Sequence, residues 1–112
     1  MRAILIKTDE QKIEEVEFNG TLDDAYRLLG CELIERVELG NGEDLWVDEE
    51  GLINGRGRQF GFFCYIHYPQ ILAGRGLITG TMIDPNDPDE GETFGPSTTP
   101  LEDARKRVVW KP

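Results

Sequence analysis

The chain has few of the residues on which most catalytic and metal sites depend. Its 112 residues include two cysteines and a single histidine, His67. A hydrolase triad needs a histidine, a nucleophile and an orienting carboxylate, so any such site would have to use His67. Cys31 and Cys64 have neither the spacing of a metal site nor the number needed for a disulfide framework. We therefore expect no enzyme, no cofactor, no metal site and two buried free thiols.

Long apolar runs are also missing. No segment approaches the roughly 20 apolar residues that a membrane-spanning helix needs. Residues 1–7 lack the longer apolar region and small-residue cleavage site of a signal peptide. We expect a cytoplasmic protein that does not bind membranes.

Basic residues are scarce. The chain has 12 Lys and Arg against 22 Asp and Glu, which gives a net charge of −10. Nonspecific binding to duplex DNA depends on clustered Lys and Arg, so this balance argues against it. It favours attraction to a basic partner, through a surface formed by the loop after Ile83 together with Glu14, Glu15, Glu17, Glu35 and Glu38.

Alternating apolar residues predict a mostly antiparallel sheet. One hairpin is expected over residues 3–18 and a second over residues 31–47, turning at Gly40-Asn41-Gly42. Residues 77–82 form a buried strand framed by glycines. The chain is long enough for one modest core, so residues 1–112 are expected to form a single α+β domain with about five strands.

Two helices are expected outside this sheet. After the first hairpin, Thr21 can cap a helix that ends at Gly30, with Asp24 in the capping-box position. Residues 84–98 are rich in Pro, Gly and acid and read as a loop. A C-terminal helix follows, with Thr99 as its N-cap, Pro100 at its first position and an apolar face formed by Leu101, Ala104 and Val108.

Three segments in this order resemble domain-of-unknown-function family 3846, whose members are small proteins mainly of phages and mobile elements. The first combines the strands and helix start at 2–7, 14–18 and 20–22. The second is the segment 45–52, and the third is the apolar segment 71–80. The likeness covers about residues 1–82. The resemblance implies an α+β fold, a mobile-element origin and, for a phage protein, the host cytoplasm; it implies no activity. The family is typically helical after the second hairpin, and the resemblance favours a helix here too; the strand propensity of residues 59–68 is the alternative that stays open.

The most informative segment is a 33-residue stretch, 51–83, that contains no acidic residue. Its arginines stand beside glycines, which let a backbone approach phosphate, and guanidinium groups bind phosphate through two hydrogen bonds. We expect Arg56, Arg58 and Arg75 to hold phosphates while Phe60, Tyr65 or His67 faces a base. The alternative is that the aromatic residues form core and the arginines pair with surface carboxylates.

Two chemical alternatives are weaker. Cys64 and His67 are spaced so that a thiolate could be activated, but their apolar neighbours favour simple packing. The acidic loop 84–92 could bind a cation loosely, although Pro88 and Asp89 depart from the EF-hand pattern.

The leading hypothesis is therefore a small noncatalytic accessory protein that binds an anionic ligand, such as a nucleotide or short oligonucleotide, and could sequester a host signal. On this hypothesis, replacing Arg56 and Arg58 with alanine abolishes binding and leaves the thermal midpoint nearly unchanged. The second hypothesis is an acidic module that mimics nucleic-acid charge and inhibits a basic host protein. A homo-oligomer would be consistent with an aromatic stretch larger than one small core can bury.

Overall fold

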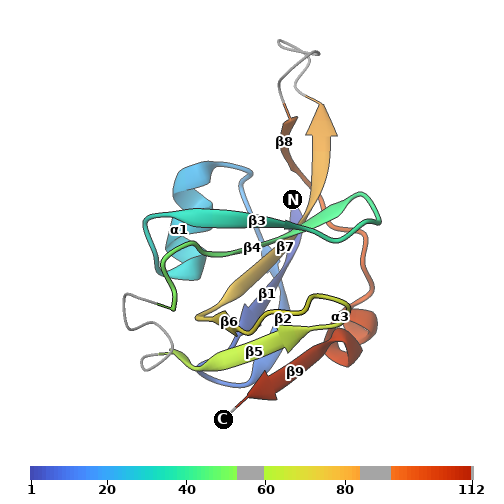
Figure 1. The fold of residues 1–112 in the computed structure, drawn as a ribbon. Coiled ribbons are helices and arrows are strands. Elements are labelled where there is room, and N and C mark those ends of the chain that lie inside the picture. Colours follow the sequence, from blue (N-terminus) through green and yellow to red (C-terminus); the bar gives the residue numbers. More distant parts are fainter. Residues whose placement is uncertain (53–59, 84–91, 112) are drawn as a thin grey trace.

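The chain folds into two packed antiparallel sheets, with a helix on the outer face of the larger sheet (Figure 1). The computed structural model describes residues 1–52, 60–83 and 92–111. Its elements are β1 (Arg2–Lys7), β2 (Lys12–Glu17), α1 (Leu22–Leu29), β3 (Ile34–Glu38), β4 (Glu43–Asp48), β5 (Phe62–Tyr65), β6 (Leu72–Ala73), β7 (Gly76–Ile83), β8 (Glu92–Gly95), α3 (Leu101–Arg107) and β9 (Val108–Lys111). The α+β class predicted from the sequence is confirmed.

The larger sheet has the strand order β2-β1-β7-β4-β3, and β8 pairs with the far part of β7. Alternation in β1 sends successive side chains to opposite faces of this sheet. Ala3 and Leu5 join the core layer beneath α1. Ile4 and Ile6 join the layer between the two sheets. The central strands are therefore buried on both faces, which explains the continuous apolar run at the start of the chain.

The smaller sheet, β6-β5-β9, closes the second core layer. Phe63 of β5 lies opposite Leu72 of β6 and Trp110 of β9. Phe63 and Tyr65 are both buried in this layer. This second sheet was not anticipated from the sequence. It makes residues 62–65 a strand, so the helix that the family resemblance favours is wrong for these four residues, whereas Phe60 is helical and residue 59 lies outside the described residues.

Helix α1 has the caps that the sequence predicts. The Thr21 hydroxyl accepts a hydrogen bond from the Asp24 backbone N–H at 3.2 Å, and Gly30 adopts the left-handed conformation with φ 69°. Gly30 also donates to the Tyr26 carbonyl at 2.8 Å. The Asp24 carboxylate departs from a capping box, because it accepts from the backbone of Asn19 rather than Thr21.

The C-terminal helix departs from the prediction at both ends. Its N-cap is Pro100, because the Thr99 hydroxyl donates instead to the buried carboxylate of Glu43 at 2.9 Å. Val108 was expected on the apolar face of this helix. It starts β9 instead, since pairing with Tyr65 of β5 continues the smaller sheet.

The predicted loop 84–98 is partly a strand. Residues 84–91 lie outside the described residues, but β8 pairs with β7. Gly80 of β7 lets the backbone that follows β8 pass close by, since a Cβ there would clash with the carbonyl oxygen of Pro96. The prediction of two buried thiols is correct for Cys31 and wrong for Cys64, which is half-buried because its neighbours Phe63 and Tyr65 occupy the core-facing positions of β5.

Candidate ligand-binding site

The residues predicted from the acid-free stretch separate into two places. Arg56 and Arg58 lie outside the described residues. Phe60 and Arg75 lie together near the end of α1. The remaining two, Tyr65 and His67, lie at the end of β5 and just after it, and both line a hollow there.

Arg75 is held in an intramolecular ion pair. Its Nε and Nη2 atoms donate to the two carboxylate oxygens of Asp9 at 2.9 and 2.8 Å. Its guanidinium carbon lies 5.4 Å from the centre of the Phe60 ring. The hydrogen bond to Asp9 raises the pKa of Arg75 despite partial burial, and the same bond lowers the pKa of Asp9. Arg75 would have to release Asp9 before it could bind a phosphate.

Tyr65 and His67 line a hollow of about 380 Å³ between the β3–β4 hairpin and the turn after β5. One wall comes from the end of β3 and the residues after it, including Glu38 and Asn41. The other wall comes from residues 65–68 and from Arg107, the last residue of α3. The hollow thus combines segments from three distant parts of the sequence.

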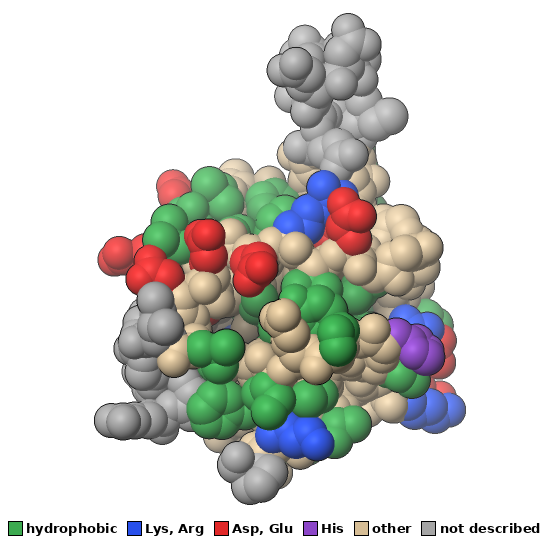
Figure 2. Space-filling model, in the orientation of Figure 1, with side chains coloured by type: hydrophobic (Ala, Val, Ile, Leu, Met, Phe, Trp, Pro, Cys, Tyr) green, Lys and Arg blue, Asp and Glu red, His purple; other side chains and the backbone are tan. Residues whose placement is uncertain are grey.

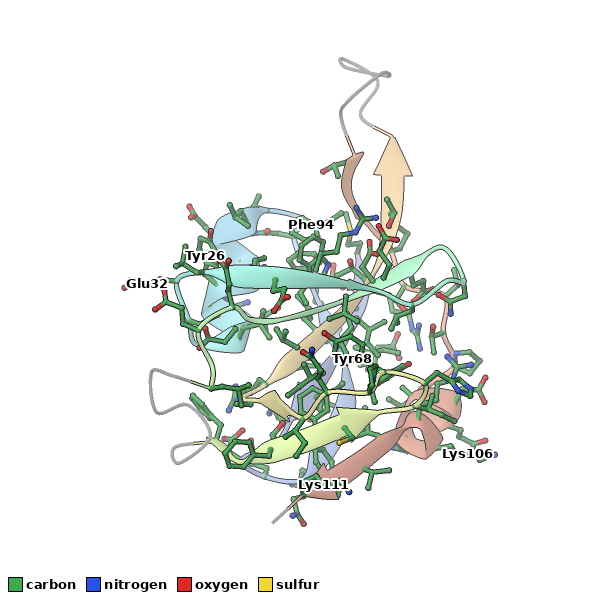
Figure 3. All side chains as sticks on the ribbon, viewed as in Figure 1. Tyr26, Glu32, Tyr68, Phe94, Lys106 and Lys111 are labelled. Atoms are coloured by element: carbon green, nitrogen blue, oxygen red, sulfur yellow. The ribbon has the colours of Figure 1, made fainter. Side chains whose placement is uncertain are left out.

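Short backbone hydrogen bonds fix the wall that follows β5. The Ile66 N–H donates to the Arg107 carbonyl at 2.8 Å, and the Tyr68 N–H donates to the Tyr65 carbonyl at 3.0 Å. Between them, His67 has a left-handed backbone with φ 65°, which is uncommon for a residue with a side chain. Figure 3 shows Tyr68 projecting between β3 and β5, in the region of this hollow.

Tyr65 carries an unsatisfied polar atom at this place. Its side chain is only 4% exposed, and its ring belongs to the core between the sheets. Its hydroxyl is buried without a hydrogen-bond partner among the described residues. A buried hydroxyl without a partner costs roughly 1–3 kcal/mol, so such a group in a native protein needs an explanation. A ligand group that enters the hollow would supply one.

Arg107 is distinctive among the six described arginines. The other five donate to a carboxylate or a backbone carbonyl; they are Arg2, Arg27, Arg36, Arg75 and Arg105. The Arg107 guanidinium has no such partner among the described residues, yet it lines the hollow. A guanidinium and a hydroxyl that lack partners among the described residues and belong to the lining of one hollow can together bind an anionic group.

Sequence reasoning missed Arg107. It lies outside the acid-free stretch, in the basic last turn Arg105-Lys106-Arg107, where cations commonly balance a helix dipole. The Cys64–His67 pair gains no support from the geometry. Strand alternation puts Cys64 on the side of β5 opposite Tyr65, and Cys64 does not line the hollow.

Neither a membrane helix nor a metal cluster is found in residues 1–52, 60–83 and 92–111. No helix there is long and apolar enough to cross a bilayer. No group of three or more His, Cys, Asp or Glu side chains there is placed to hold a metal ion.

Fold and site together define a small α+β protein in which two packed antiparallel sheets leave a ligand-sized hollow at one end. The profile of the family described as "Domain of unknown function (DUF3846)" matches residues 1–95. The chain belongs to this family, which confirms the resemblance inferred from its motifs. Tyr65 and His67 lie inside the matched segment and Arg107 lies beyond it. No curated protein and no solved structure gives a significant match to the chain.

Proposed function

We propose that the protein is a noncatalytic binding protein and that the hollow at the end of β5 takes a small anionic ligand, such as a nucleotide or the end of a short oligonucleotide. The observation that carries the proposal is that Tyr65 and Arg107 line the same hollow, while the buried Tyr65 hydroxyl and the Arg107 guanidinium both lack a hydrogen-bond partner among the described residues. Its volume of about 380 Å³ lies within the usual range for small-molecule sites.

Each wall has a distinct role on this proposal. Arg107 binds the phosphate or carboxylate through two parallel hydrogen bonds. The Tyr65 hydroxyl donates to the same anion or to a neighbouring oxygen. His67 and Tyr68 offer ring faces on which a base can stack. Glu38, at the rim, can accept from a ligand hydroxyl or amino group.

The biological setting is proposed from the family resemblance. A phage or mobile-element protein that holds a nucleotide without consuming it would lower the free concentration of a host signal. Such a protein would remain in the host cytoplasm and would need no cofactor.

Native mass spectrometry of the protein purified directly from its expression host tests this proposal. We expect a retained anionic mass at one copy per chain, which disappears after denaturation and refolding. Arg107→Ala should lose this mass because it removes the main anion contact. Lys106→Ala is the matched control, since it removes one positive charge from a side chain that points out from α3 (Figure 3). Equal retention by Arg107→Ala and the wild type would exclude Arg107 from the site.

Tyr65→Phe is expected to raise stability and weaken ligand binding at the same time. Removing a buried hydroxyl that has no partner in the described part of the chain should increase the free energy of unfolding by about 1 kcal/mol in the absence of ligand. Urea unfolding measures this change. Tyr68→Phe is the control, because its hydroxyl is already bonded to Gln70 at the surface. A clear loss of stability in Tyr65→Phe would show that the hydroxyl is satisfied in the free protein.

A further inference from the structure

Strand β3 is an open edge of the larger sheet. In the described part of the chain it pairs only with β4. The opposite edge, β2, is covered differently, because α3 packs on it and the Arg105 guanidinium donates to the Ile13 carbonyl at 3.3 Å. An open edge offers a row of backbone donors and acceptors to an added strand.

The register shows which backbone groups of β3 face outward. Leu39 donates to the Glu43 carbonyl, and the Leu33 carbonyl accepts from Glu49. Odd-numbered residues therefore bond to β4, because hydrogen-bonded positions alternate along an antiparallel strand. Ile34 and Glu38, at even-numbered positions, present their backbone N–H and C=O groups to the open side.

Exposed apolar side chains surround this edge. Leu33 precedes β3 and is about half exposed. Ile66 and Ile71, in the segment between β5 and β6, are exposed to the same extent. Leu52, which follows β4, is 67% exposed. A second hollow, of about 220 Å³, lies here, and Leu52 and Ile71 line it. Apolar residues gathered in this way are typical of an interaction surface.

The five glutamates predicted to belong to one acidic surface lie on opposite edges of the sheet, whereas residues 84–91 of that predicted surface lie outside the described residues. On the β2 edge they are neutralised: Glu14, Glu15 and Glu17 pair with Lys7, Arg2 and the N-terminus. On the β3 side, Glu35, Glu49 and Glu50 line the second hollow and have no ion-pair partner among the described residues. Figure 2 shows red acidic side chains over the β3 region, above a group of green hydrophobic ones.

These observations indicate the chemistry of the occupant. A second copy of the chain is disfavoured, because it would place one acidic edge against another. A segment that alternates basic and apolar residues would complement both the carboxylates and the exposed apolar side chains. The acidic side chains at this edge could serve only to prevent pairing between two copies of the chain. That role would not explain the exposed apolar side chains beside them.

We propose that the β3 edge binds an extended basic segment of a protein partner, which adds as a further strand to the sheet. The bound segment donates to and accepts from the backbone of Ile34 and Glu38. Its apolar side chains cover Ile66 and Ile71, and its lysines or arginines approach the acidic hollow. This develops the acidic-surface hypothesis and confines it to one edge.

The test uses a fluorescein-labelled short peptide of alternating lysine and valine, followed by fluorescence anisotropy and amide hydrogen exchange. On binding, we expect slower exchange at Ile34 and Glu38 and no change at Glu35 and Val37, which already bond to β4. A version with its valines replaced by proline should not bind, because it keeps the charges and loses backbone donors.

Charge-reversal variants distinguish an effect of the charges at this edge from an effect of the net charge of the protein. Glu35→Lys combined with Glu49→Lys should weaken peptide binding about tenfold or more, because both changes place like charges at the interface. The matched double variant, Glu17→Lys with Glu102→Lys, changes the net charge equally at exposed sites away from β3 and should bind nearly as the wild type does. Equal losses in the two doubles, protection of other amides, or no saturable binding up to about 1 mM peptide would each overturn the proposal.

Discussion

Replacing Phe63 with alanine is expected to lower the free energy of unfolding by about 3–5 kcal/mol, which is the usual cost of removing a fully buried aromatic ring. Phe63 is completely buried in the core layer between the two sheets. Its ring lies so close to Gly76 of β7 that a Cβ there would be 3.1 Å from its Cζ atom. The ring therefore joins the smaller sheet to the centre of the larger one, and its loss would leave a cavity that neither sheet can close.

Urea denaturation of Phe63→Ala and Phe62→Ala measures this effect with an internal control. Phe62 is the neighbouring residue on β5, half-buried on the opposite side of the strand. The control should lose clearly less stability. Similar losses in the two variants would show that the sheets do not pack through Phe63.

Replacing Glu43 with glutamine is expected to cost about 2–3 kcal/mol near neutral pH, because hydrogen bonds to a buried charge are stronger than those between neutral groups. Glu43 is 6% exposed and begins β4. Its carboxylate accepts from the Ser97, Thr98 and Thr99 hydroxyls at 2.6, 3.0 and 2.9 Å, and from the Thr98 N–H at 2.7 Å. This one carboxylate thereby holds the segment that connects β8 to α3.

The contribution of Glu43 should depend on pH with a defined sign. Burial raises the pKa of its carboxyl, but the hydrogen bonds from Ser97, Thr98 and Thr99 outweigh burial and lower the pKa overall. A lowered folded-state pKa means that the stabilisation is present above the carboxyl's unfolded pKa and is lost as pH falls through the folded pKa. The stability difference between wild type and Glu43→Gln should therefore shrink in acid.

Thermal unfolding over a series of acidic pH values measures this dependence. Glu102→Gln, at an exposed position on α3, serves as the control and should show no comparable change with pH. A difference between wild type and Glu43→Gln that stays constant across the series would mean that the carboxylate is not held by its three hydroxyl partners.

The sequence predicts those elements whose signals are local. Both hairpins follow from alternation, and α1 follows from Thr21 and Gly30, which cap it as expected. The start of the C-terminal helix could not be predicted in the same way. Thr99 has the right chemistry for an N-cap, but Glu43, 56 residues earlier in the chain, binds its hydroxyl instead. Short strands such as β9 form because a partner strand is present, and no local pattern reports that partner.

The candidate site could likewise be predicted only where its residues share a local sequence signal. Tyr65 and His67 were found because they lie in a compositionally unusual stretch. Arg107 was missed because it lies 40 residues beyond His67 and reaches the hollow only through the pairing of β9 with β5. Composition likewise grouped Arg75 with the site, although Asp9 already binds its guanidinium.

The most direct test of ligand binding at the hollow is an NMR titration of the ¹⁵N-labelled protein with a mixture of ribonucleoside monophosphates. We expect saturable shifts at the amides of His67, Tyr68 and Arg107, with an affinity about tenfold or more weaker in Arg107→Ala and nearly unchanged in Lys106→Ala. Shifts centred on Phe60 and Arg75, or equal affinities of wild type and Arg107→Ala, would contradict the assignment of the hollow as the binding site.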